Sequence, residues 1–180
     1  EITELRSSKG PLKISEVVDR NPIYDALFKG AGEIGIPTNK DYNGDEQEGI
    51  SYTQTTIFKG ERMSAEVAYL RPIRSRKNLT IITNSLVTKL LFDGKTCIGV
   101  KIKNKNKIKD FFAQNEVILC GGAINSPQIL ELSGIGNRSI LEEKGISVVH
   151  ELKGVGENLR DHLGPRLVYN ITKRGISYND

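Results

Sequence analysis

The sequence predicts an α/β protein with some α+β character, and three observations lead to this fold class. Short strand-like segments follow one another over residues 78–119, with Asp93-Gly94 as a hairpin turn between two of them. The apolar run Val117–Cys120 is followed at once by two glycines and a helix start, the pattern of a buried parallel strand that turns into a helix. A separate helix opens earlier, at Asn21-Pro22.

Ahead of residue 78 the expected elements are short. The alternating stretch Leu12–Ser15 predicts a strand, and the helix capped by Asn21 carries an apolar stripe that ends at Gly35-Ile36-Pro37. A strand is expected over residues 51–58. A helix is expected over residues 61–73, where a proline closes the segment.

From residue 78 onward, strands are expected over residues 79–83, 85–92, 96–103 and 111–119. Ser126 is expected to cap a helix that holds Pro127 in its first turn and runs to Leu132. A short helix over 139–144, a strand over 146–152 and a glycine-rich loop over 154–163 complete the prediction.

The composition is that of an ordinary globular protein. The chain has 180 residues, 37% apolar and 27% charged, which suffices for one domain with a core or for parts of two. No apolar run approaches the ~20 residues of a membrane span, and no signal peptide opens the sequence. The sequence does not begin with Met, and we expect both ends to be cuts in a longer protein.

Lysine stands at every second position from Lys101 to Lys109, although the net charge is only +4. If this row lines one side of a hairpin, it suits a nucleic acid or an acidic partner. The lack of interleaved aromatic residues favours a solvated hairpin tip instead, so no nucleic acid is expected. Cys97 and Cys120 have no partner at metal-ligand spacing, which predicts buried thiols in a reducing compartment and no metal site.

The strand-to-helix crossing at residues 117–128 is the strongest candidate for a ligand site. Such crossings place main-chain N–H groups and the positive end of a helix at the carboxyl end of a strand, where open α/β sheets bind ligands. Two glycines at this point let the backbone approach a dinucleotide closely. The same pattern also serves simple packing, and the pattern alone does not decide between the two.

The longer stretch Gly122–Gly136 resembles the second signature of the glucose–methanol–choline (GMC) oxidoreductases. That signature is a small-residue pair, Ser-Pro, two aliphatics, then Ser-Gly-aliphatic-Gly. Residues 41–49, 62–72, 78–87 and 154–162 are similar to other family segments in order and spacing, so the resemblance covers roughly residues 8–170. It implies part of an FAD/NAD(P)-binding Rossmann-like domain together with part of a GMC substrate-binding domain.

The resemblance also implies domains and site residues. Residues 1–77 would belong to the substrate domain and its connecting helices, residues 78–158 to the FAD-binding domain, and residues 159–180 to a return into the substrate domain. Val87 would contact the adenine through its main-chain N–H and C=O, and Gly121, Gly122 and Ala123 would pass close to the ribose and pyrophosphate. No catalytic residue is expected in the chain, because the family's catalytic His lies beyond its C-terminal end.

Neither histidine of the chain is therefore expected to be catalytic. His150 ends a predicted strand and is expected at the surface. His162 is expected to fix its loop by hydrogen bonds. Glu157 and Asp161 are expected to form a salt-bridged turn with Arg160, which lies between them.

The implied function is FAD-dependent oxidation of a primary alcohol to an aldehyde, with hydride transfer to the flavin and a quinone or an artificial dye as electron acceptor. An oxygen-using alcohol oxidase, a flavin-containing lyase of the same family and a basic non-enzymatic binding module stay open. We expect the 180-residue chain alone neither to bind FAD tightly nor to turn over alcohol. A cytoplasmic location is expected, and peripheral association with the inner face of a membrane stays open.

One departure from the family pattern bears on the substrate. In choline-type members the loop after Asp-His-x carries a carboxylate that meets the trimethylammonium group. Gly164 occupies that position here, followed by Pro165 and Arg166. A cationic substrate needs a negative or aromatic partner, so the sequence favours an uncharged primary alcohol.

Overall fold

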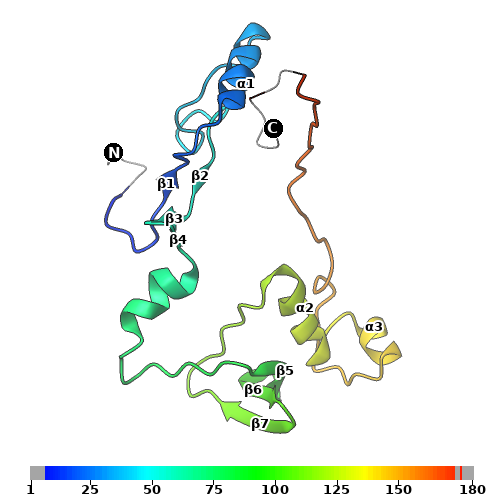
Figure 1. The fold of residues 1–180 in the computed structure, drawn as a ribbon. Coiled ribbons are helices and arrows are strands. Elements are labelled where there is room, and N and C mark those ends of the chain that lie inside the picture. Colours follow the sequence, from blue (N-terminus) through cyan, green and yellow to red (C-terminus); the bar gives the residue numbers. More distant parts are fainter. Residues whose placement is uncertain (1–6, 173–174, 176–180) are drawn as a thin grey trace. The chain divides into compact units, whose positions relative to one another are not determined.

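A computed structural model of the protein describes residues 7–172 and residue 175, which group into two compact units. The first unit is Glu1–Thr80 with Leu167–Asp180, and the second is Ile81–Arg166 (Figure 1). Residues 1–6 of the predicted first segment, and 173–174 and 176–180 of the predicted return segment, lie outside the described residues. Assigning these units to substrate and FAD domains stays a prediction.

Helix α1, Pro22–Glu33, is the main element of the first unit, and it begins as predicted. The Asn21 side chain accepts a hydrogen bond of 3.0 Å from the N–H of Ile23, and the proline occupies the first turn. The N–H groups of the first turn have no intrahelical acceptor. The cap therefore satisfies one of these N–H groups, and the proline removes no hydrogen bond from the helix. Gly35 stops the helix with a left-handed φ of 84°.

Two small antiparallel pairs accompany α1. Strand β1, Ser15–Glu16, pairs with β2, Gln54–Thr55, and β3, Ile57–Phe58, pairs with β4, Glu61–Arg62. The predicted strand over 12–15 therefore lies further along the chain, and the one predicted over 51–58 is divided in two. The β3–β4 turn consists of Lys59 and Gly60, both with positive φ.

The helix predicted over residues 61–73 is only partly correct. Its first two residues form β4, and the rest folds as a π-helix, Glu66–Leu70, followed by a 3₁₀-helix, Arg71–Ile73. Pro72 has no N–H to donate into a regular α-helical ladder, which gives a physical reason for the irregular winding.

An ion-pair network joins β4 to this irregular helix. Arg71 lies 2.9 Å from the Glu61 carboxylate and 3.1 Å from that of Glu66, and Arg74 lies 2.9 Å from Glu66. The hydrogen bond from Arg71 lowers the pKa of Glu61 below its ordinary value. The network therefore holds the hairpin against the helix most firmly when both carboxylates are ionised.

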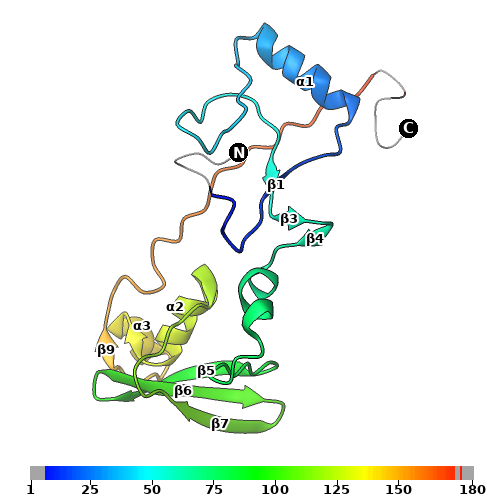
Figure 2. The same ribbon diagram turned by 90° about the vertical axis from the view of Figure 1, so that its left-hand side faces the viewer.

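The second unit is built on an antiparallel sheet of strand order β5-β6-β7 (Figure 2). The strands are β5, Leu86–Asp93, β6, Thr96–Asn104, and β7, Lys107–Phe112. The hairpin predicted at Asp93-Gly94 is confirmed, since Asp93 pairs with Thr96 and Gly94 has a φ of 55°. Leu90 and Ile102, at 5% and 7% exposure, form the core face of the sheet.

Helix α2, Gly122–Leu132, packs against β5 and continues into a small second layer. Strand β8, Ile135–Gly136, pairs in parallel with β9, His150–Glu151, and α3, Arg138–Glu143, lies between them in the chain. The predicted helix over 139–144 is thus confirmed to within one residue. Of the strand predicted over 146–152, only β9 forms.

Two predicted strands are absent from the described part of the chain. Residues 79–83 form no strand. Strand β7 ends at Phe112 and Val117–Cys120 form no strand either, so the buried parallel strand expected there is absent. Ile118 is 74% exposed. A strand requires a neighbour for its main-chain N–H and C=O groups, and the described residues offer none at either place. The prediction of buried thiols is also wrong, because Cys97 is half-buried and Cys120 is exposed.

We expect Gly49→Ala to destabilise the protein by about 1–3 kcal/mol. Gly49 has a φ of 126°, and an added Cβ would lie 2.5 Å from the carbonyl oxygen of Pro37. As a matched control, Gly30→Ala falls inside α1, where nothing lies within 4 Å, and should stabilise by about 0.5–1 kcal/mol. Urea unfolding measures both changes, and equal stability of Gly49→Ala and the wild type would contradict the structure at this turn.

Arg71→Gln should return the pKa of Glu61 towards its ordinary value. Because the folded-state pKa is lowered, the pair stabilises the fold at a pH above the unfolded-state pKa of Glu61, and this stabilisation is lost as the pH falls through the folded-state pKa. Unfolding measured between roughly pH 3 and pH 7 should therefore show a weaker acid dependence in Arg71→Gln. Arg76→Gln, which removes no ion pair found among the described residues, should retain the wild-type profile.

Candidate cofactor site

The four predicted site residues all fall in the second unit, at the two elements that pack together. Val87 lies on β5, Gly121 precedes α2, and Gly122 and Ala123 are the first residues of that helix. The structure therefore brings α2 and the strand that carries Val87 into contact. What this arrangement offers a ligand depends on where the main-chain groups of both elements point.

Strand β5 is an edge strand, so one of its two edges has no strand partner among the described residues. The N–H of Leu90 points to that outer edge, where it donates a hydrogen bond of 2.8 Å to the Ser133 hydroxyl. Leu90 and Val100 therefore form a pair that exchanges no main-chain hydrogen bonds. In an antiparallel ladder such pairs alternate with hydrogen-bonded ones.

The main-chain groups of Val87 face the same outer edge. Val87 lies opposite Ile102, two residues along β6 from Val100, so this pair also exchanges no ladder hydrogen bonds. Val87 and Leu90 are three positions apart, so in a regular strand their main-chain groups would face opposite edges. The register shift between Val87 and Lys89 inserts Thr88 as an extra residue in β5, and both residues therefore face the same edge. The bulge thus leaves the N–H and C=O of Val87 available to a ligand.

The opening of α2 is free of any side-chain cap. Gly121 is the residue before the helix, and among the described residues no side chain caps the first N–H groups. Gly122 is exposed with a φ of 80°, and nothing lies within 4 Å of where its Cβ would be. Uncapped N–H groups at the positive end of a helix suit an anionic or hydroxyl-bearing ligand.

The start predicted for this helix is wrong. The helix begins at Gly122 rather than at a Ser126 cap, and Pro127 lies inside it. A proline this close to the start removes only one bond of the ladder, to the carbonyl of Ala123. Gly122 extends the helix because glycine tolerates the left-handed φ that its entry requires.

The far end of α2 is fixed by residues for which the sequence predicted no individual role. Ser133 is 1% exposed, accepts the Leu90 hydrogen bond, and donates one of 2.5 Å to the carbonyl of Ile129. Gly134 follows with a φ of 91°, and a Cβ there would lie 2.3 Å from the carbonyl oxygen of Ser147. The available signal was a serine inside an otherwise apolar and glycine-rich stretch.

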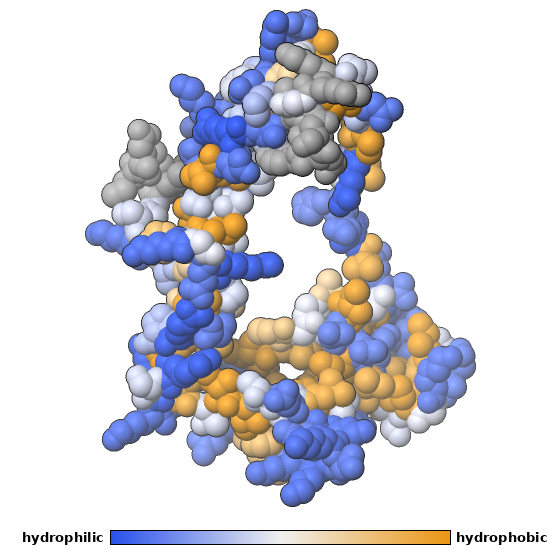
Figure 3. Space-filling view, viewed as in Figure 1, coloured by the Kyte–Doolittle hydropathy of each residue, from blue (hydrophilic) through white to orange (hydrophobic). Residues whose placement is uncertain are grey.

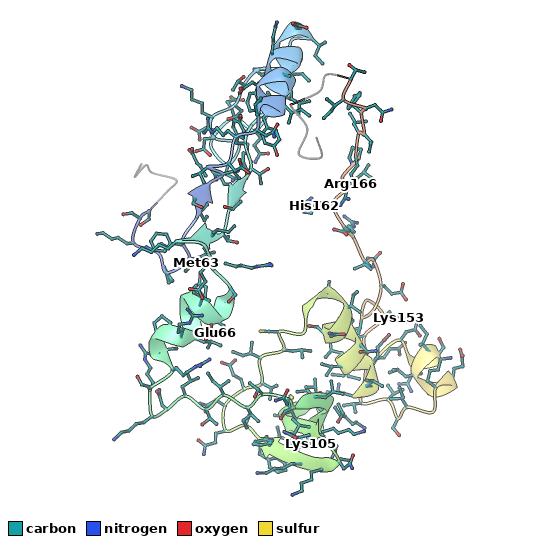
Figure 4. The ribbon with its side chains drawn as sticks, viewed as in Figure 1. Met63, Glu66, Lys105, Lys153, His162 and Arg166 are labelled. Carbon is teal, nitrogen blue, oxygen red and sulfur yellow. The ribbon has the colours of Figure 1, made fainter. Side chains whose placement is uncertain are left out.

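The lysine row does not line one side of its hairpin. Residues directly opposite each other on paired strands share a face, which places Lys103 with Ile108 and Lys109 with Ile102, on opposite faces. Lys101 bonds Asp110 at 2.6 Å. Lys105 occupies the turn with a positive φ (Figure 4), and hydrophilic side chains gather over this hairpin in the view of Figure 3. The one-sided row on which the binding-module alternative depends is therefore not formed.

After the turn that follows β9, residues 157–172 are exposed and form no helix or strand, and they include His162 and Arg166 (Figure 4). Asp161 accepts a hydrogen bond of 2.8 Å from the main-chain N–H of His162. Within the described ranges no ion pair joins Arg160 to Glu157 or Asp161, so the predicted salt-bridged turn is wrong. No hydrogen bond of the His162 ring is found there either, whereas the predicted exposure of His150 is confirmed.

The first unit holds a cavity of about 530 Å³ beside α1. Tyr52 forms one wall, stacked on Phe28 at 4.8 Å and covered by the Arg20 guanidinium at 4.5 Å. None of the predicted site residues lines it.

No helix in the described part of the chain is long and apolar enough to cross a bilayer.

Residues 3–164 match the family model of the GMC oxidoreductases, and the chain belongs to that family. It is 44% identical to the mitochondrial choline dehydrogenase of Homo sapiens over 158 residues, covering 88% of this chain and 27% of the human protein. It is also 44% identical to the oxygen-dependent choline dehydrogenase of Photobacterium profundum, over 81% of this chain and 26% of that protein.

A solved structure supports the same relationship. An FAD-dependent oxidoreductase from Chaetomium thermophilum superposes with a TM-score of 0.82 at 34% identity, over 87% of this chain and 28% of that one. The prediction of a Rossmann-like FAD-binding fragment in a GMC fold is confirmed by these matches. The chain spans about a quarter of the length of the relatives that it matches.

We expect Gly134→Ala to destabilise the second unit by about 2–4 kcal/mol, since it combines left-handed strain with a main-chain clash. Gly145→Ala is the matched control, with a φ of 69° and nothing within 4 Å of its Cβ. It should cost only about 1 kcal/mol. Thermal unfolding compares the two, and equal losses would contradict the close approach of Gly134 to Ser147.

Proposed function

We propose that the full-length protein is an FAD-dependent oxidoreductase that oxidises a primary alcohol to an aldehyde. Family membership supports the enzyme class, and the outer edge of β5 beside the uncapped opening of α2 supports the cofactor. When bound, FAD would supply the acceptor for the hydride that leaves the alcohol carbon. The residues of this chain would bind and orient the cofactor.

The residues present suit FAD. The adenine edge carries a hydrogen-bond acceptor and a donor side by side, which complements the outward N–H and C=O of Val87. The uncapped N–H groups at the opening of α2 suit the ribose and pyrophosphate, and Gly122 leaves space beside them. Val87, Gly121, Gly122 and Ala123 would therefore hold the adenosine half of FAD.

The domain assignment follows from the same residues. Residues 78–158 would form part of the FAD-binding domain, because they contain both β5 and α2. Residues 1–77 and 159–180 would belong to the substrate domain and its connections. This assignment rests on the proposed roles of Val87 and of the opening of α2.

Choline is a second candidate substrate, favoured by the names of the two relatives at 44% identity. Against it, Gly164 stands where choline-type members carry a carboxylate, and the nearby Arg166 is exposed and cationic. Repulsion between Arg166 and a trimethylammonium group disfavours choline, so we propose an uncharged primary alcohol. For the electron acceptor we propose a quinone, for which an artificial dye can substitute, with oxygen as the alternative that the Photobacterium relative suggests.

Anaerobic mixing of the full-length protein with alcohols tests this function. An uncharged primary alcohol such as benzyl alcohol should bleach the flavin absorbance at least tenfold faster than choline, and a quinone should restore it. Faster bleaching by choline would contradict the substrate proposal, and peroxide formation in air would identify an oxidase. No bleaching by any alcohol would support a lyase with a structural flavin.

The role of the Val87 main chain can be tested separately. Val87→Pro removes an N–H that makes no ladder hydrogen bond, so the strand should persist while FAD affinity falls about tenfold. Val87→Ile retains the main-chain groups and should bind FAD as the wild type does. Titration of the deflavinated full-length protein with FAD measures both, and equal affinity of the two variants would contradict main-chain recognition.

A further inference from the structure

One buried hydroxyl connects the two elements that are proposed to hold FAD. Ser133 lies just beyond the C-terminal end of α2 and is 1% exposed. Its Oγ accepts a hydrogen bond from the N–H of Leu90 and donates one to the carbonyl of Ile129. Because both bonds are made, the hydroxyl proton has a single favoured orientation and the link is directional.

The bond to Leu90 takes the place of a strand partner on the outer edge of β5. Val87 presents its main-chain groups at the same edge, three residues away, with the bulged Thr88 between them. Three residues of extended strand span about 10 Å. A fixed position of Leu90 therefore fixes the position of the Val87 main chain.

The bond to Ile129 fixes the other element. Ile129 lies in the same helix as Gly122, and a helix is stiff along its axis. Ile129 follows Gly122 by seven positions, which corresponds to a rise of about 10 Å. The hydroxyl thus joins a point on β5 close to Val87 to a point on α2 at a set distance from its opening.

We propose that Ser133 is a positioning residue for FAD. Its hydroxyl sets the separation between the Val87 main chain and the Gly121–Ala123 segment, so that one FAD molecule can bind both, and Ser133 itself does not touch the cofactor. The proposal rests on the proposed function. It differs from a purely structural role because it requires FAD affinity to change in a protein that remains folded.

The experiment uses the full-length protein, stripped of flavin and titrated with FAD. Ser133→Ala should weaken FAD binding about tenfold, the size of one lost hydrogen bond, and alter the visible circular dichroism of the bound flavin. Ser133→Thr retains the hydroxyl and should restore both properties. Leu141→Met is the control, since Leu141 is as deeply buried in the same unit but belongs to α3. It should leave the dissociation constant within about twofold of the wild type.

An unchanged FAD dissociation constant in folded Ser133→Ala, or an equal loss in Leu141→Met, overturns the positioning role. If Ser133→Ala does not fold, Ser133→Cys replaces it, since a thiol keeps the side-chain size and weakens both hydrogen bonds. A tenfold weaker dissociation constant in Ser133→Cys then supports the proposal, and an unchanged one overturns it. A wild-type protein that binds no FAD overturns the proposed function and this inference together, whereas normal wild-type binding with an unaffected variant overturns the inference alone.

Discussion

The hydrogen bond from the Leu90 N–H to the Ser133 hydroxyl is the interaction on which the second unit depends most. An edge strand has a row of N–H and C=O groups that must bond to water, a ligand or another element. One buried side chain satisfies one of these groups and anchors a helix there at the same time. The rest of the outer edge near Val87 remains available for recognition, which is what a cofactor site on a strand requires.

The residues after Ser133 are explained by close packing rather than by contact with a ligand. Gly134 accepts hydrogen bonds from the N–H groups of Val149 and His150, at 2.8 and 3.1 Å, which begin the parallel pairing of β8 with β9. Gly136 lies against Leu141, the most deeply buried apolar side chain of the described core. The Ser-Gly-aliphatic-Gly part of the motif therefore fixes the C-terminal end of α2, and the helix in turn positions its own opening.

Local patterns predicted the elements whose stabilising contacts are local. The Asn21 cap and the Asp93-Gly94 hairpin were predicted because a side chain or a tight turn defines each within a few residues. Val117–Cys120 was predicted as a strand from its apolar run alone, but a strand also needs a neighbour, and periodicity does not supply one. The start of α2 was predicted wrongly because Ser126-Pro127 has the pattern of a capped helix start. Gly122, with its left-handed φ, instead allows the helix to begin earlier in the chain.

The candidate site shows the same division between local and long-range information. Family resemblance predicted site residues on two elements that the structure brings into contact, Val87 on β5 and the glycines at the opening of α2. It did not show why Val87 in particular presents its main chain, since that depends on the Thr88 bulge and on pairing with β6. Nor did it give Ser133 a role, because the partner of that hydroxyl lies 43 residues away in the chain.

The cofactor proposal requires that the outer edge of β5 at Val87 recognises the adenine of FAD through main-chain groups. A crystal structure of the full-length protein with FAD bound is the decisive measurement. The Val87 N–H and C=O should hydrogen-bond the adenine edge while the Leu90 N–H remains on Ser133. Another strand paired along that edge, or an adenine bound elsewhere, would show that this mode of recognition is wrong.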